Sequence, residues 1–201
     1  MQIWTTNAYT GMVGAFNVQG AFWDRVRRRF SKTSGQLRRL AAGVSPWDVA
    51  EMQALVDTAL PAPWVGAFAS LTNTSRAVRV LDGLHGEQSV ALNPGGADII
   101  TFAPLVEGPG GVRFGALGLS NMLNSGGAIA GFALERRTFA IELLGEGEFV
   151  ASSSAAPQGV EVDGTPLKRG TSGWAWDAGR LSVEVVAGHR TSVKHSVRIT
   201  F

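Results

Sequence analysis

Short apolar segments separated by turn residues make up most of the chain after residue 63. Gly, Pro, Asn or Asp residues bound each of these segments, which are 64–71, 76–81, 88–92, 98–106, 112–122, 129–134, 137–144 and 148–154. Segments of this length and spacing are typical of strands. Residues 181–185 and 193–201 alternate apolar with polar side chains, which predicts strands with one buried and one wet face. The pattern predicts an all-β fold, an antiparallel β-sandwich.

The first 63 residues show a different pattern. Residues 1–6 and 11–18 predict two strands with a turn at residues 9–11, and the polar stretch 31–43 predicts a loop. Ser45 then precedes a proline and is followed three residues later by Asp48, which is a capping-box pattern. We therefore expect one short helix near 46–60, which the prolines at 61 and 63 end.

The stretch 114–131, FGALGLSNMLNSGGAIAG, contains the strongest turn signal of the chain. The paired glycines Gly126 and Gly127 can supply the positive φ of a tight turn, and the preceding Asn124 and Ser125 readily bond their own backbone. We therefore expect two buried strands joined by a hairpin at residues 125–127. Asp163-Gly164 predicts a second hairpin turn.

Composition indicates an ordered globular chain, with one domain over residues 1–201. Of the 201 residues 45% are apolar and none is cysteine, so the fold does not depend on disulfides and suits a reducing compartment. The sequence holds no apolar run of about 18 residues, which predicts that the membrane is not a partner. No signal-peptide pattern follows Met1, so we expect a cytoplasmic location.

The basic residues are unevenly distributed. The net charge is +2, but seven of the 18 basic residues lie in one segment, at Arg25, Arg27, Arg28, Arg29, Lys32, Arg38 and Arg39. A nucleic-acid site would need a basic face with interleaved aromatics along one element. Since the cluster lies in a polar stretch, we expect a solvated loop and no nucleic-acid partner.

Candidate catalytic chemistry is sparse. The aspartates are Asp24, Asp48, Asp57, Asp82, Asp98, Asp163 and Asp177, and a helix cap explains Asp48 as a turn explains Asp163. The histidines His85, His189 and His195 lack the short paired spacing of a zinc site, so we expect no metal and no cofactor. His195 has the parity of apolar neighbours, and a core histidine is the favoured interpretation.

Aromatic and amide residues offer a possible binding surface. Trp174 and Trp176 share parity and would point to one face of a strand, where they could stack on a sugar or pack in the core. Burial is the commoner outcome for tryptophan. Gln19, Asn121 and Asn124 lie in apolar surroundings, where amides usually hold backbone groups.

Two blocks of the sequence resemble one known family. Residues 118–129, GLSNMLNSGGAI, and 3–23, IWTTNAYTGMVGAFNVQGAFW, are similar to motifs of the raffinose synthase and seed imbibition family, α-galactoside enzymes of glycoside hydrolase family 36 related to alkaline α-galactosidases. Residues 45–49 also fit, whereas Ala8 and Val18 depart from the family's Lys and Cys. The resemblance runs to about residue 185 and thins between the blocks.

The resemblance implies a function for the whole family rather than for this segment. Family members transfer galactose to sucrose or hydrolyse α-galactosides without a cofactor, on carboxylates carried by a (β/α)8 barrel. No residue here matches those motifs, so the chain would be a non-catalytic C-terminal β-domain lacking the barrel. The alternative is a free-standing carbohydrate-binding module for α-galactosides.

The resemblance also assigns roles to particular residues. It implies structural roles for motif positions, namely Asn17, Gln19, Gly20, Asn121, Asn124, Gly126 and Gly127. The exposed apolar face that would meet the barrel is expected at Trp4, Phe16, Phe22 and Trp23, with the barrel or a second copy as partner. Trp4 and Trp23, with Trp174 and Trp176, are the candidate sugar-stacking or interface residues.

Overall fold

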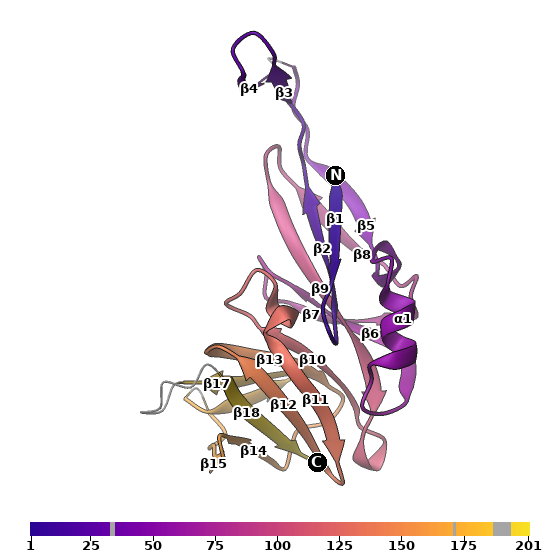
Figure 1. Cartoon of the computed structure of the whole chain (residues 1–201), viewed down its shortest axis with the longest axis vertical. Coiled ribbons are helices and arrows are strands. Elements are labelled where there is room, and N and C mark those ends of the chain that lie inside the picture. The colour runs from indigo at the N-terminus through magenta and orange to yellow at the C-terminus, as the bar shows by residue number, and fades with distance from the viewer. Residues whose placement is uncertain (33–34, 171, 187–193) are drawn as a thin grey trace.

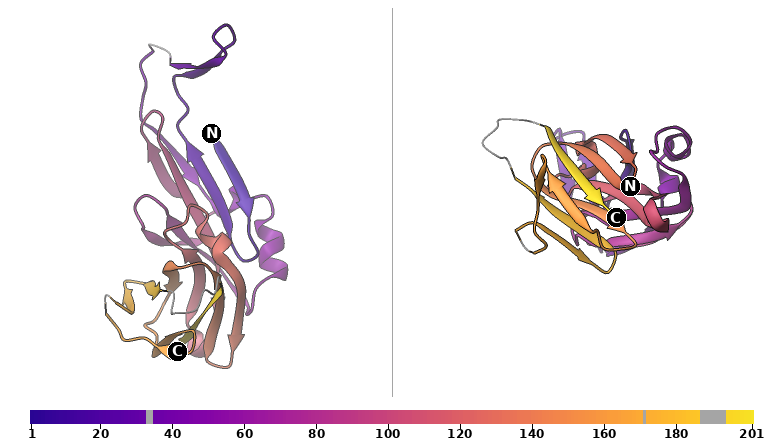
Figure 2. Two further views of the ribbon diagram at one scale, coloured as in Figure 1. Left: turned by 60° about the vertical axis from the view of Figure 1, so that its left-hand side comes forward. Right: turned by 90° about the horizontal axis from the view of Figure 1, so that it is seen from below.

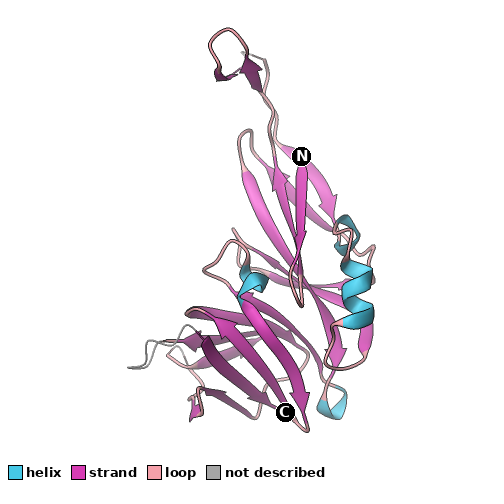
Figure 3. Ribbon diagram, in the orientation of Figure 1, coloured by secondary structure: helices cyan, strands magenta, loops and turns pink. Residues whose placement is uncertain are grey.

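The computed structural model describes residues 1–32, 35–170, 172–186 and 194–201, and two antiparallel sheets dominate them (Figures 1 and 3). The sheets pack face to face at one end of an elongated molecule. The chain's one α-helix within the described residues lies alongside the middle of the body (Figure 1). The predicted all-β sandwich with one short helix is confirmed.

The larger sheet runs the length of the body. Its strands follow the order β1-β2-β9-β10-β13-β17-β16, and β6 pairs with the other edge of β9 and carries β7. The bounds are β1 Gln2–Thr6, β2 Gly11–Phe16, β6 Trp64–Thr72, β7 Val78–Asp82, β9 Ala97–Glu107, β10 Arg113–Leu119, β13 Gly147–Ser153, β16 Trp174–Asp177 and β17 Arg180–Val185. The eleven-residue β9 is the axis, since both β2 and β10 pair along one of its edges.

The second sheet covers the C-terminal end of the first. Its order is β11-β12-β18-β14-β15, with bounds β11 Ile129–Glu135, β12 Thr138–Leu144, β14 Gly159–Val162, β15 Thr165–Pro166 and β18 Lys194–Thr200. Between the layers lies a core in which Phe114 stacks on Phe139 with ring centroids 4.4 Å apart. The alternation seen in the sequence places Leu181, Val183 and Val197 in this core.

A second core forms on the same face of the large sheet, beyond the part that the second sheet covers. There the helix α1 Met52–Thr58 packs its buried Met52 against the sheet beside Phe68 and Phe102. The hairpin of β5 Leu40–Val44 with β8 Gln88–Leu92 completes the cover. The sequence-predicted helix is shorter than expected, because the 3₁₀ turn η1 Pro46–Asp48 ends at the extended residue Val49 before α1 begins.

Some local predictions were confirmed and others were wrong. The Asp163-Gly164 turn joins β14 to β15 with positive φ at both residues, as a two-residue hairpin requires. The polar stretch 31–43 is not all loop, because β5 begins at Leu40. Its side chains are largely exposed, so periodicity of burial could not reveal it.

The arginine-rich segment forms a hairpin that projects from the body at the top of Figure 1. Its strands are β3 Ala21–Asp24 and β4 Arg29–Lys32. The Asp24 carboxylate accepts hydrogen bonds from the backbone N–H of Val26 and Arg27, which builds the turn between them. The arginines are exposed as predicted, but the predicted loop is wrong, because β3 and β4 pair as a hairpin.

Two short 3₁₀ turns complete the list of elements, and none of the described helices could span a membrane. The turns are η2 Pro109–Gly111 and η3 Ser125–Ala128. Within the described residues, every helix is too short or too polar to cross a bilayer.

Candidate functional site

Residues 120–128 form a corner that carries the chain from one sheet to the other. Strand β10 pairs with β9 and β13, whereas β11 pairs with β12 in the second sheet. The predicted hairpin at residues 125–127 is therefore wrong, and the turn signal marks the 3₁₀ turn η3 instead. Turn residues report a local change of direction but not which strands then pair.

The corner binds the β1–β2 turn through a pair of side-chain amides. Asn7 Nδ2 donates to Asn124 Oδ1 at 2.8 Å, and Asn124 Nδ2 donates back to Asn7 Oδ1 at 2.9 Å. Asn7 Nδ2 also donates to Thr10 Oγ1 at 3.0 Å, and Asn124 Oδ1 accepts from the Gly127 N–H at 3.2 Å. The two sequence blocks that carry the family resemblance therefore meet in space.

Close approach explains the glycines of the corner. A Cβ on Gly126 would collide with the buried Thr10 side chain, and one on Gly118 would collide with the carbonyl of Ser125. Gly118 has φ +94°, but Gly126 and Gly127 are absent from the residues with positive φ. The expected reason for the paired glycines was therefore wrong: at Gly126 space is the constraint, not backbone handedness.

Buried hydroxyls and an aromatic contact extend the corner in both directions. Ser125 Oγ donates to Thr101 Oγ1 of β9 at 2.9 Å, and both residues are buried. Tyr9, beside the amide pair, makes an edge contact with Phe132 of β11 at 5.9 Å. The corner thus ties together the N-terminal hairpin and both sheets.

The tip of the corner points outward and is apolar. Asn121 Nδ2 donates to the carbonyl of Glu146 at 3.1 Å, which holds the base of the tip. Beyond it, Leu123 is 68% exposed and Met122 is 38% exposed. Asn121 itself is exposed, so the expected apolar surroundings are not found there.

The other motif residues hold the base of the projecting hairpin. Asn17 is buried, and its Nδ2 donates to the carbonyls of Arg38 and Leu92 at 3.1 and 2.9 Å. Gln19 Oε1 accepts from the Arg38 N–H at 3.0 Å. Gly20, at φ +76°, would bring a Cβ within 2.5 Å of Leu37. These contacts join the two legs of the hairpin to each other and to β8.

The four candidate tryptophans divide into two classes. Trp4 and Trp23 are 48% and 51% exposed, which suits an interface. Trp174 is buried, with its Nε1 donating to the Leu167 carbonyl at 3.2 Å, and Trp176 is half-buried, with its Nε1 donating to the Ser153 carbonyl at 3.1 Å. The last two share a face, as predicted, but that face packs into the sandwich core.

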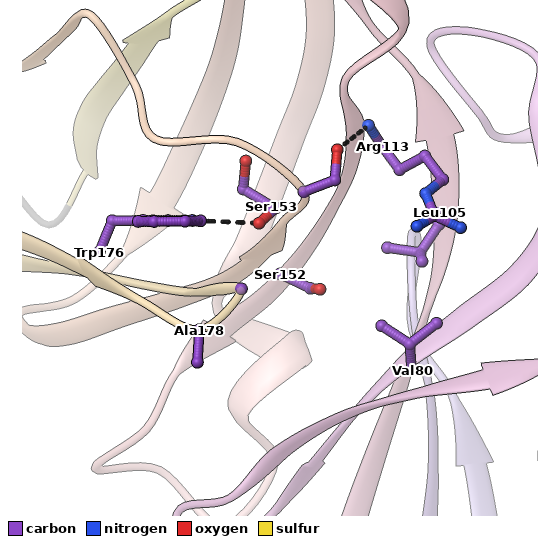
Figure 4. A pocket seen from close by; sticks show the side chains of 9 residues that line it. Val80, Leu105, Arg113, Ser152, Ser153, Trp176 and Ala178 are labelled. Carbon is purple, nitrogen blue, oxygen red and sulfur yellow. Dashed lines mark hydrogen bonds between the residues drawn. The ribbon is translucent and has the colours of Figure 1, made fainter.

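A pocket opens beside Trp176 of β16 in the large sheet (Figure 4). It has a volume of about 370 Å³ and its lining includes Leu105, Arg113, Ser152 and Trp176. Arg113 is the charged residue of the lining, and no carboxylate contributes. The pocket can therefore accept hydroxyl or anionic oxygens but does not present a general acid–base pair.

A polar cluster lies farther along the same sheet. Glu148 accepts hydrogen bonds from Ser120 Oγ and from Arg180, each at 2.6 Å. Burial by itself raises the pKa of Glu148, but these hydrogen bonds and the charges of Arg180 and Arg76 outweigh it, so the pKa lies below its ordinary value. Glu148 is therefore a fixed anion paired with a cation, not a proton donor at neutral pH.

The histidine prediction is confirmed for His195. Its side chain is buried, and its Nδ1 lies 2.8 Å from Asp163 Oδ2, while Asp163 Oδ1 accepts from the Ser196 N–H at 2.8 Å. Among the described residues its Nε2 has no hydrogen-bond partner. Asp163 thus fixes the ring from the β14–β15 turn. His189 lies outside the described residues.

Two further acids have structural roles. Asp48 accepts from the Ser45 N–H at 2.8 Å, as the capping pattern predicted, and Asp98 accepts from the Thr74 N–H at 3.1 Å. Across residues 1–32, 35–170, 172–186 and 194–201, no three His, Asp or Glu side chains gather as metal ligands would. The described acids thus form no cluster of three, although Glu148 on β13 lies directly opposite Glu184 on β17.

Comparison with known proteins identifies the family. The family described as raffinose synthase or seed imbibition protein Sip1 matches residues 1–185. The chain belongs to this family. It is 34% identical over 171 residues to a probable galactinol–sucrose galactosyltransferase 5 of Arabidopsis thaliana, covering 85% of this chain and 22% of the relative.

Two further relatives extend the comparison. A galactinol–sucrose galactosyltransferase of rice is 32% identical over 82% of this chain and 21% of its own length. A stachyose synthase of pea is 26% identical over 92% of this chain and 21% of its own length. The chain thus spans about one fifth of the length of the curated relatives that it matches.

Sequence reasoning missed two features of this region. It did not pair Asn7 with Asn124, which are 117 positions apart. It did not predict the Glu148–Arg180 pair, although Glu148 on β13 and Arg180 on β17 are both charged residues within strand-like segments. A charged residue within a strand-like segment is the signal that could have marked Glu148 and Arg180.

Proposed function

We propose that this chain is the non-catalytic β-domain of a galactosyltransferase of the raffinose synthase family. The observation that carries the proposal is that the chain matches only about one fifth of each relative. Retaining glycosidic chemistry needs two carboxyl groups about 5–5.5 Å apart. By this proposal, the galactosyl transfer from galactinol to sucrose that the relatives' names indicate takes place on another part of the enzyme.

Exposed apolar groups mark where that other part would pack. Ile3 and Trp4 on the edge strand β1 are 52% and 48% exposed, and Met122 and Leu123 form the apolar tip of the corner. Interfaces between domains of one chain bury about 600–1,500 Å². Large apolar side chains left in water at both places support a packing role.

Activity measurements on the purified chain test the proposal. We expect no hydrolysis of an aryl α-galactoside and no raffinose from galactinol and sucrose. The portion of the Arabidopsis relative outside the match, made separately, should bind the chain, and Leu123→Glu should weaken that binding. Turnover by the chain alone, retained after purification to homogeneity, would refute the proposal.

A matched variant serves as the control for the binding experiment. Leu144→Glu replaces another exposed leucine, 38% exposed on β12, and should leave the binding unchanged. If both substitutions weakened binding equally, the corner would not be the docking surface.

The pocket beside Trp176 favours a second candidate, a carbohydrate-binding module for α-galactosides. Arg113, Ser152 and the edge of Trp176 converge there, and its volume of about 370 Å³ suits one or two sugar rings. Titration with raffinose, followed by NMR, tests this candidate. Specific shifts at the pocket, lost in Arg113→Gln but kept in Arg79→Gln, would favour the module over the supporting domain.

A further inference from the structure

The projecting hairpin forms a basic arm, defined here as the described residues between 20 and 39. Figures 1 and 2 show it extending beyond the end of the body. Its described side chains include one acid, Asp24, and six exposed arginines, namely Arg25, Arg27, Arg28, Arg29, Arg38 and Arg39. Among the ion pairs of the described residues, the arm's share is the Arg27–Asp24 pair at 3.2 Å. Most of the arm's positive charge is therefore uncompensated.

The arm also presents apolar surface to water. Phe22 is 46% exposed, Val26 is 93% exposed and Leu37 is 42% exposed. A lone two-stranded hairpin is marginally stable at best in water, because it has no core of its own. The arm is basic, exposes apolar side chains and has no core beneath it. Such a surface is typical of one that a partner covers.

An acidic face lies elsewhere on the same molecule. It consists of Glu51 and Asp57, at the start of and within α1, and Asp82 and Glu87 at the adjoining β7–β8 loop, all four exposed. The Trp47 N–H of η1 donates to the Leu84 carbonyl of this loop at 2.9 Å, and Leu84 packs against the same core as Val56 of α1, which places the loop beside η1 and α1. Trp47 itself is 60% exposed there. The face therefore combines negative charge with an exposed aromatic ring.

Sequence composition makes the two surfaces complementary. Residues 20–39 contain seven basic residues and one acid, whereas residues 40–112 contain seven acids and two basic residues, Arg76 and Arg79. Within the described residues, the four acids of the face take part in none of the ion pairs. Opposite fields of this kind steer association and suppress contact between like surfaces.

A single copy cannot join its own arm to its own acidic face. The arm extends past the N-terminal end of the body, whereas α1 lies alongside the body in both views (Figures 1 and 2). We propose that the arm of one copy docks on the acidic face of a second copy, and reciprocally, in a two-fold symmetric dimer. This inference goes beyond the proposed function, because it concerns a contact between copies and not one with a catalytic part.

Two charge-reversed variants test the proposal. The arm variant carries Arg25→Glu, Arg28→Glu and Arg29→Glu, which leaves the Arg27–Asp24 pair in place. The face variant carries Glu51→Lys and Asp57→Lys. We expect the wild type to sediment as a dimer at up to about 100 µM and low salt, and each variant alone to be monomeric, because like charges then meet.

Mixing the variants provides the decisive measurement. In an equimolar mixture, the reversed arm meets the reversed face, and the native arm of the face variant meets the native face of the arm variant. Both contacts regain opposite charges, so the mixture should dimerise although neither component does. Glu142→Lys with Glu146→Lys, on exposed acids outside the face, is the control and should remain dimeric.

Several outcomes would overturn the proposal. These are a wild type that stays monomeric, dimers that survive both reversals, and monomeric variants that do not associate when mixed. A monomer whose arm instead binds a single-stranded oligonucleotide, with binding lost in the arm variant, would assign the arm to nucleic acid. Circular dichroism of each variant distinguishes lost association from lost folding.

Discussion

The corner and the basic arm represent opposite ways of using a turn. In the corner, Ser125 lies against Gly118 and Gly126 against Thr10 so closely that no added atom fits, and the amides of Asn7 and Asn124 satisfy each other. In the arm, the turn after Asp24 is held by local bonds, and the side chains around it face water. The corner is specified by packing with distant segments, whereas the arm is specified by its own short sequence.

This difference teaches where each region's specificity resides. A packed corner transmits any change of volume to both sheets, because protein interiors have almost no free space. An exposed hairpin can change most side chains without changing the fold. Stability should therefore be concentrated in the corner, and interaction chemistry in the arm.

The largest effect should come from Gly118→Ala. This residue combines φ +94° with a Cβ position blocked by the Ser125 carbonyl, so the substitution should cost more than about 3 kcal/mol of unfolding free energy. Gly164→Ala is the matched control, because φ is +76° but the space is open. We expect it to cost about 1 kcal/mol. Equal losses in chemical denaturation would show that backbone handedness alone matters.

The amide pair should have the next largest effect. Asn7→Ala and Asn124→Ala should each cost about 1–2 kcal/mol, because each leaves the partner's amide without its hydrogen bonds in a partly buried place. A double-mutant cycle should give a coupling of about 1 kcal/mol. Asn93→Ala, on an exposed asparagine, is the control. Additive losses would mean that the pair does not act as a unit.

Low pH should lower the free energy of unfolding through protonation of Glu148. Because the folded-state pKa of Glu148 lies below its ordinary value, the unfolded chain binds more protons as the pH falls. The stabilisation is therefore present above the ordinary pKa and is lost as pH falls through the folded pKa. Melting temperatures of Glu148→Gln should vary less over this range than those of Glu146→Gln. Parallel curves for both variants would exclude this assignment.

The smallest effect should come from the arm. Phe22→Ser and Arg25→Ala should each change the unfolding free energy by less than about 0.5 kcal/mol, because both side chains are exposed. Calorimetry at a concentration below that of association provides the measurement. A larger loss would mean that the arm packs on the body, and would remove the contrast with the corner.

Local signals in the sequence predicted individual elements well. The strand segments, the Ser45–Asp48 cap, the Asp163-Gly164 turn and the inward His195 follow from side-chain alternation, capping and turn chemistry. The predicted helix was too long because one apolar pattern spans two separate elements, the 3₁₀ turn η1 and the helix α1. The arm was missed because its strands contain no alternation of apolar with polar residues.

By itself, the sequence determined the all-β class, the family and the exposed position of the arginines, because these depend on composition, periodicity and short motifs. Tertiary structure alone decided that residues 125–127 lead into another sheet and that Asn7 meets Asn124. The physical reason is that strand pairing and close packing join residues far apart in the chain. No local pattern encodes which distant partner a strand or an amide will find.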